Sequence, residues 1–118
     1  MVEARGGPAV PSDPRALLDE VVRRIVEVAQ PDEIILFGSG ARGEIGPDSD
    51  LDFLVVKSGV PHRRHLAQEI DLAMFGIPLP VDIIVVTPED IEALRDKAGT
   101  IVGPALREGK RVYAACAA

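Results

Sequence analysis

The chain has 118 residues, with 13 lysine and arginine side chains against 19 aspartate and glutamate side chains, and so a formal net charge of −6 at pH 7. A chain of this length builds one core and has little left for a second, which excludes a large separate acceptor-binding domain within it. The acidic balance argues against direct, stable DNA binding, because that mode needs Lys and Arg concentrated on one face.

The organisation expected from the sequence is one domain behind a short leader. Residues 1–12 are rich in turn formers and have no apolar periodicity, so we predict a flexible leader followed by a single domain over 13–118. Neither a membrane-spanning run nor the apolar stretch of a signal peptide is found, which predicts a cytoplasmic protein without membrane contact. The single Cys116 is assigned no role.

Apolar periodicity and turn residues predict alternating helices and strands. A capping residue, Ser12, precedes the first apolar stripe at three and four residue steps, and short apolar runs bounded by Gly, Pro or Asp are typical of covered strands. We expect helices over 14–30, from 61 to before 78, from 88 past 94 and over 101–107, and strands over 34–37, 51–56, 81–86 and 111–113.

Aspartates interrupt two of these apolar strands. Asp50 and Asp52 project from the same face of one strand, with Cα atoms roughly 7 Å apart, and Asp82 joins them if the next strand lies alongside. Three carboxylates in one small volume repel each other unless a divalent cation sits between them, and oxygen ligands favour magnesium or manganese. Taken singly, each aspartate has a plainer explanation as a turn cap, an ion-pair partner or a solvated strand end.

A glycine-rich turn follows the first strand. Gly38 and Ser39 open the stretch Gly38-Ser39-Gly40-Ala41-Arg42-Gly43, and glycine lets a phosphate approach the backbone closely. The spacing matches neither the dinucleotide fingerprint nor the Walker A loop. The turn is therefore either a phosphate loop or only a tight connection.

Together these residues resemble a known signature. Leu36 to Gly43, followed by Ser49-Asp50-Leu51-Asp52, is similar to the Gly-Ser, ten residues, Asp-x-Asp motif of the DNA polymerase beta superfamily of nucleotidyltransferases, and Val81-Asp82 resembles the strand of its third carboxylate. The length and the closing segment from Arg107 to Tyr113 look most like the minimal, MntA-like members.

The resemblance implies an α+β domain of the polymerase-beta-like fold, with a mixed β-sheet flanked by helices. It implies that Asp50, Asp52 and Asp82 are catalytic and hold two Mg²⁺ ions, with Mn²⁺ as the other option, and that ATP is the substrate. The nucleotide would be bound by Gly38, Ser39, Arg42 and Ser49. Arg42 would either touch phosphate or pair with a carboxylate, and for Ser49 local turn capping is the alternative.

The same resemblance implies a partner. Minimal members are commonly paired with a HEPN-domain toxin, so we expect transfer of AMP to a hydroxyl of such a toxin, with this chain as antitoxin in a homo- or hetero-oligomer. One alternative is a non-catalytic antitoxin that neutralises its partner by binding, and another is transfer to a small molecule, as in aminoglycoside-modifying relatives. The basic run from His62 to His65 is either a solvated helix face or a contact for a partner or a substrate phosphate.

Overall fold

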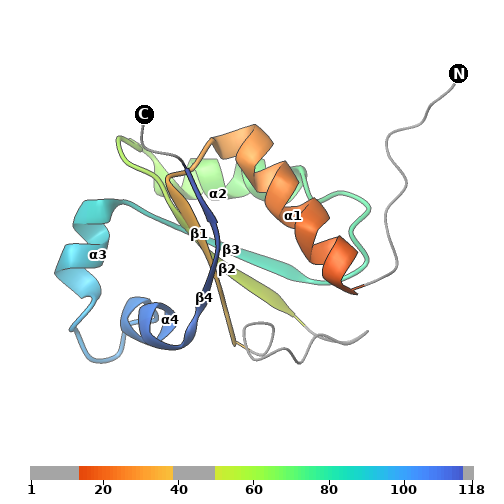
Figure 1. Ribbon diagram of the computed structural model, residues 1–118. Helices are drawn as coiled ribbons and strands as arrows, with labels where there is room; N and C mark the ends of the chain where they lie inside the picture. Colours follow the sequence, from red (N-terminus) through yellow and green to blue (C-terminus); the bar gives the residue numbers. More distant parts are fainter. Residues whose placement is uncertain (1–13, 39–49, 116–118) are drawn as a thin grey trace, which may run out of the picture.

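The computed structural model describes residues 14–38 and 50–115, which form four helices and four strands (Figure 1). The expected leader, residues 1–12, lies outside the described residues. None of the described helices combines the length and the apolarity needed to cross a bilayer. In chain order the elements are α1 (Pro14–Ala29), β1 (Glu33–Phe37), β2 (Leu51–Val56), α2 (Arg63–Leu72), β3 (Val81–Val86), α3 (Pro88–Leu94), α4 (Val102–Glu108) and β4 (Lys110–Ala114).

The strands form one mixed sheet in the order β3-β2-β1-β4. β1 is antiparallel to both β2 and β4, whereas β2 and β3 are parallel. The pairing of β1 with β4 shifts register between Ile34 and Ile35. The expected α+β class with a mixed sheet is thus confirmed, and β4 is an edge strand of this sheet, as the sequence predicts.

Helices cover both faces of the sheet. In Figure 1, α1 and α2 lie on one side and α3 and α4 on the other. Alternate strand residues supply the two cores: Ile34 and Phe53 belong to the cluster under α1 and α2, and Ile35 and Leu54 to the cluster under α3 and α4. Covering on both faces explains why the strands are continuous apolar runs rather than alternating ones.

The helix ends follow local side-chain chemistry. Thr87 caps α3 with a capping box, in which the Asp90 amide donates to Thr87 Oγ1 at 3.1 Å and the Thr87 amide donates to the Asp90 carboxylate at 2.9 Å. The predicted start of α2 at Pro61 is two residues early, because His62 is the extended N-cap residue and the helix begins at Arg63.

One arginine ties the first two helices together. Arg24 of α1 donates to Glu20 at 2.7 Å and to the carbonyl oxygens of Ala73 and Phe75, which follow α2, at 3.1 and 2.8 Å. Only 13% of the Arg24 side chain is exposed. Removing this side chain would leave the two carbonyl oxygens without a charged hydrogen-bond donor that is largely protected from water.

Replacing Arg24 by alanine is expected to lower the free energy of unfolding by about 2 kcal/mol, since charge-assisted hydrogen bonds between two elements are lost. Arg23→Ala is the matched control, because Arg23 is 49% exposed and, among the described residues, its ion pairs are with Glu20 and Glu27 of its own helix. Its expected loss is much smaller, because ion pairs on an exposed helix face contribute little to stability. Urea unfolding of both variants measures the difference, and equal losses would contradict the tethering role.

Candidate active site

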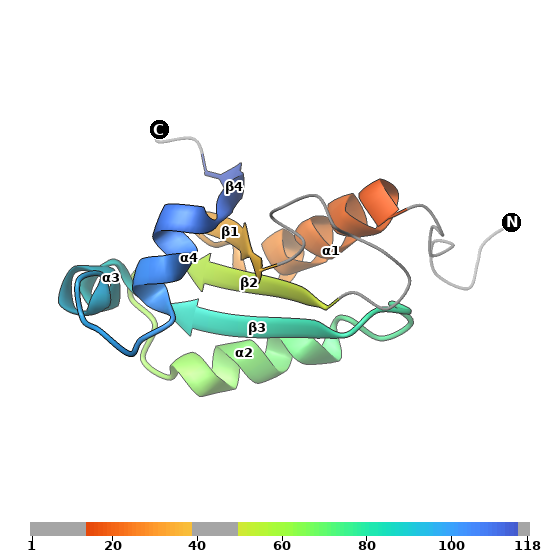
Figure 2. The same cartoon turned by 90° about the horizontal axis from the view of Figure 1, so that it is seen from below.

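The sheet register brings the predicted carboxylates to one level. Phe37 of β1 is paired with Asp52 of β2, and Asp52 is paired with Asp82 of β3. Neighbouring strands are about 4.8 Å apart, so the two aspartates are direct neighbours. Figure 2 shows β2 and β3 running side by side in the same direction, which places both aspartates near the starts of their strands.

Asp52 and Asp82 project from the face of the sheet that carries α3 and α4. Along β2 and β3, Leu54 and Val86 point into the core on that side, and side chains two residues apart share a face. Asp52 is partly buried, whereas Asp82 and Asp50, which immediately precedes β2, are exposed. The sequence-based expectation that Asp82 lies beside the Asp50–Asp52 pair agrees with this register.

The electrostatics of Asp52 reflect this crowding. Burial raises the pKa of the Asp52 carboxyl, and the negative charge of Asp82, a hydrogen bond shared with it and the charge of Asp50 raise it further. The folded protein therefore favours the neutral form of Asp52 more than the unfolded chain does. Ionised Asp52 at neutral pH destabilises the fold unless a cation offsets its charge.

Gly38 brings the start of the predicted phosphate loop against this carboxylate. Its φ angle is +75°, in the left-handed region, and a Cβ atom built on it would lie 2.7 Å from Asp52 Oδ2. Any other residue here would meet backbone strain and would force the Asp52 carboxylate to move. Ser39, Arg42 and Ser49 lie outside the described residues, so their nucleotide-binding roles stay predictions.

A fourth carboxylate near this edge was missed by sequence reasoning. Asp71, in the last turn of α2, has its pKa raised by burial and then by the charge of Asp82. The connection between the strands could have predicted its place, because a helix that connects two parallel strands must end near the start of the second strand. Asp71 adds to the negative potential that Asp52 and Asp82 create.

The donor chemistry of this edge suits a hard divalent cation. Among the described residues, no three His, Cys, Asp or Glu side chains form a ready-made metal cluster. The adjacent carboxylates Asp52 and Asp82 nevertheless offer only oxygen, the donor that Mg²⁺ and Mn²⁺ prefer. Their mutual repulsion is the kind that such a cation relieves, so the residues fit the expected metal.

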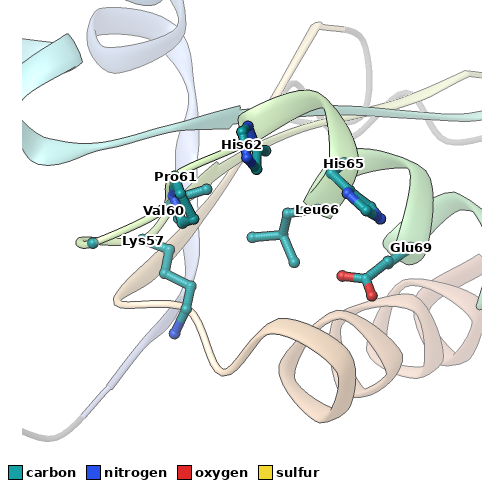
Figure 3. Close-up of a pocket in the computed structure, with 8 residues that line it drawn as sticks. Lys57, Val60, Pro61, His62, His65, Leu66 and Glu69 are labelled. Atoms are coloured by element: carbon teal, nitrogen blue, oxygen red, sulfur yellow. The ribbon is translucent and has the colours of Figure 1, made fainter.

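A cavity of about 280 Å³ lies at the other end of β2, where α2 begins. Figure 3 shows Leu66 near its centre, with Lys57 on one side and His65 and Glu69 of α2 on the other. Because Lys57 follows the C-terminal end of β2 and Asp52 is near its start, this cavity is separate from the carboxylate edge.

Comparison with known proteins decides the family. Residues 17–104 match a family model described as a nucleotidyltransferase domain. The chain belongs to this nucleotidyltransferase family. The match spans every element from α1 to the first residues of α4, and with them the edge of the sheet that carries Asp52 and Asp82.

Solved structures share the fold of this nucleotidyltransferase domain. A protein from Sulfolobus solfataricus described as a nucleotidyltransferase is 20% identical, with a TM-score of 0.55 over 82% of this chain and 77% of that one. A toxin-antitoxin structure with AMP-PNP gives 20% identity and a TM-score of 0.51 over 82% and 73% of the two chains. A mutant of the toxin-antitoxin MntA-HpeT gives 20% and 0.55 over 83% and 72%. No curated protein gave a significant match.

Substituting Gly38 by alanine is expected to damage both stability and transfer. Gly59→Ala is a matched control, since Gly59 has a φ angle of +74° but nothing within 4 Å of its built Cβ atom. We expect a loss of about 1 kcal/mol in unfolding free energy for Gly59→Ala and about 3 kcal/mol for Gly38→Ala. Thermal unfolding and nucleotide transfer test both variants, and equal effects would argue against the close approach to Asp52.

Asp52→Asn is expected to raise the melting temperature in EDTA at neutral pH, because a folded-state pKa above the unfolded value makes the ionised carboxylate destabilising. The gain should shrink as pH falls through the raised folded-state pKa of Asp52 and disappear below 3.8, where the wild-type carboxyl is mostly protonated in both states. Added magnesium should stabilise the wild type far more than the variant. Asp19→Asn, on the exposed side of α1, is the control, and equal magnesium stabilisation of wild type and Asp52→Asn would refute the metal assignment.

Proposed function

We propose that this nucleotidyltransferase domain transfers AMP from ATP to a hydroxyl group, with Mg²⁺ or Mn²⁺ bound at Asp50, Asp52 and Asp82. The observation that carries the proposal is the register that sets Asp52 beside Asp82 and puts the Gly38 backbone against the Asp52 carboxylate. The family match supports a transferase, and the oxygen donors support a hard cation.

The site residues that the structure describes have distinct tasks in this reaction. Gly38, without a side chain, lets the backbone at the start of the predicted phosphate loop lie against the Asp52 carboxylate. Asp50 and Asp82 are exposed, so they can meet an incoming acceptor as well as a metal. When bound, the two cations would neutralise charge on the attacking and leaving oxygens. The acceptor hydroxyl oxygen attacks the α-phosphorus and releases its proton to the surrounding water, the bond from that phosphorus to the bridging oxygen breaks, and pyrophosphate leaves.

The proposed acceptor is a hydroxyl on a partner protein, a HEPN-domain toxin. Two structures that share the fold are described as toxin-antitoxin proteins, one of them with AMP-PNP, which motivates this choice of partner and nucleotide. The exposure of Asp50 and Asp82 also supports it, because an open edge leaves room for a docked protein to supply the acceptor walls. A cytoplasmic location and a single domain over 13–118 stay predictions.

Incubation with ATP, magnesium and the protein encoded beside this chain is expected to add one or more AMP units to that protein. Intact mass spectrometry measures the added mass. Asp50→Ala and Asp82→Ala should abolish the shift, since each removes a carboxylate from the reacting edge, while Asp19→Ala should keep it. Ser39→Ala should weaken nucleotide binding only modestly, since one hydroxyl is one contact among several.

Complex formation, measured separately by size-exclusion chromatography, separates the competing functions. A tight complex whose partner never changes in mass would support the non-catalytic antitoxin and refute transfer to this partner. AMP transfer to an added aminoglycoside, with none to the protein, would favour a small-molecule enzyme.

A further inference from the structure

The C-terminal part of the chain carries a charge opposite to that of the whole. Between residues 95 and 111 there are five Lys and Arg and two Asp and Glu, which gives a local charge of +3 in a protein of net charge −6. These cations are spaced irregularly along the sequence, unlike the continuous basic run from His62 to His65. The fold brings three of them together.

Arg95, Lys97 and Arg107 line one cavity of about 230 Å³ between the end of α3 and α4. Asp96 is the one acidic residue among those that line it. Arg95 also contacts Glu92 at 3.4 Å, with side chains 52% and 76% exposed, which is a weak surface pair that a stronger anion can displace. The cavity therefore presents mainly positive charge.

The local structure holds these cations in place. A Cβ atom at Gly103 would lie 2.6 Å from the Arg95 carbonyl oxygen and 3.1 Å from Arg107 Nη1, so the glycine allows α4 to approach the end of α3. Thr100 Oγ1 donates to the carbonyl oxygens of Leu94 and Lys97 at 3.1 and 3.2 Å. The loop between the two helices is thus fixed by its own hydrogen bonds.

We propose that this cavity binds a small inorganic phosphate anion of the size of pyrophosphate. The two guanidinium groups offer planar forks of N–H donors and the ammonium adds a compact positive charge, and phosphate oxygens bind well to both. Its volume is below the roughly 300 Å³ at which pockets for drug-sized ligands begin, which favours a small phosphate anion over a larger ligand.

The site is distinct from the carboxylate edge and does not depend on the proposed reaction. The α3–α4 loop lies near the arrowheads of β2 and β3 in Figure 2, whereas Asp52 and Asp82 are near the opposite ends of these strands. Two separate sites of opposite charge can therefore be tested independently.

Titration of ¹⁵N-labelled protein with sodium pyrophosphate in EDTA, followed by NMR, tests the proposal. We expect saturable shifts of the backbone amides of Gly99, Thr100 and Gly103, with affinity that falls as salt increases. Arg95→Gln combined with Arg107→Gln should weaken binding by at least about tenfold. Lys110→Gln combined with Arg111→Gln removes the same charge from β4, outside the cavity, and should change the affinity by no more than about twofold.

The outcomes separate this site from its alternatives. Retained affinity in Asp52→Asn supports the proposal, and shifts centred on Gly38 and Asp52 would overturn it. Equal weakening by the two double variants would overturn it too, because a diffuse positive field would then explain the binding. ATP that binds more tightly than pyrophosphate at the same amides would overturn the assignment to an inorganic anion, and so would the lack of any saturable shift.

Discussion

Because β2 and β3 run parallel in one sheet, the chain must return across the sheet between them, and α2 makes this return. The same connection covers one face of the sheet, and Asp71 in the last turn of its helix lies within reach of the charge of Asp82, which the strand pairing sets level with Asp52. A shift of one residue in this register would turn one aspartate to the opposite face. The acidic edge is thus a product of strand pairing as much as of residue type.

Two carboxylates show how the surroundings of a negative charge decide whether it stabilises or destabilises the fold. Glu20, on α1, has its pKa lowered to about 2, first by its hydrogen bond with Arg23 and also by Arg24, against the opposing effect of burial. Its ionised form stabilises the fold above its usual pKa of 4.5, and this contribution is lost as pH falls toward 2. Asp52 is shifted the other way by burial and by other carboxylates. Neighbouring carboxylates that destabilise the fold are expected at a functional site, where the charges are needed for the chemistry.

The sequence predicted most of the fold because its signals were local. The bounds of β2 and β3 were predicted correctly, since one apolar run lies between Asp50 and Lys57 and the other between Pro80 and Thr87, and each contains a single aspartate. The start of α2 was wrong by two residues because proline at 61 has the pattern of a first helical residue, whereas His62 holds the N-cap position.

Features that depend on contacts between distant parts of the chain could not be predicted from the sequence in this way. The approach of Asp71 to Asp82 and the gathering of Arg95, Lys97 and Arg107 depend on how α2, α3 and α4 lie against the sheet. The pattern of apolar residues within one helix or strand does not predict how that element packs against the others. The catalytic roles assigned to Asp50, Asp52 and Asp82 came from the family resemblance and stay predictions.

The strand order leaves β3 at one border of the sheet that the described residues form. Five of its six residues are valine or isoleucine, a composition that favours the addition of a further strand from another molecule. Asp82 is the single charge on this strand, and an added strand would have to desolvate it. The carboxylate therefore also protects the protein against self-association, and a variant that neutralises it needs its aggregation state checked before any loss of activity is attributed to chemistry.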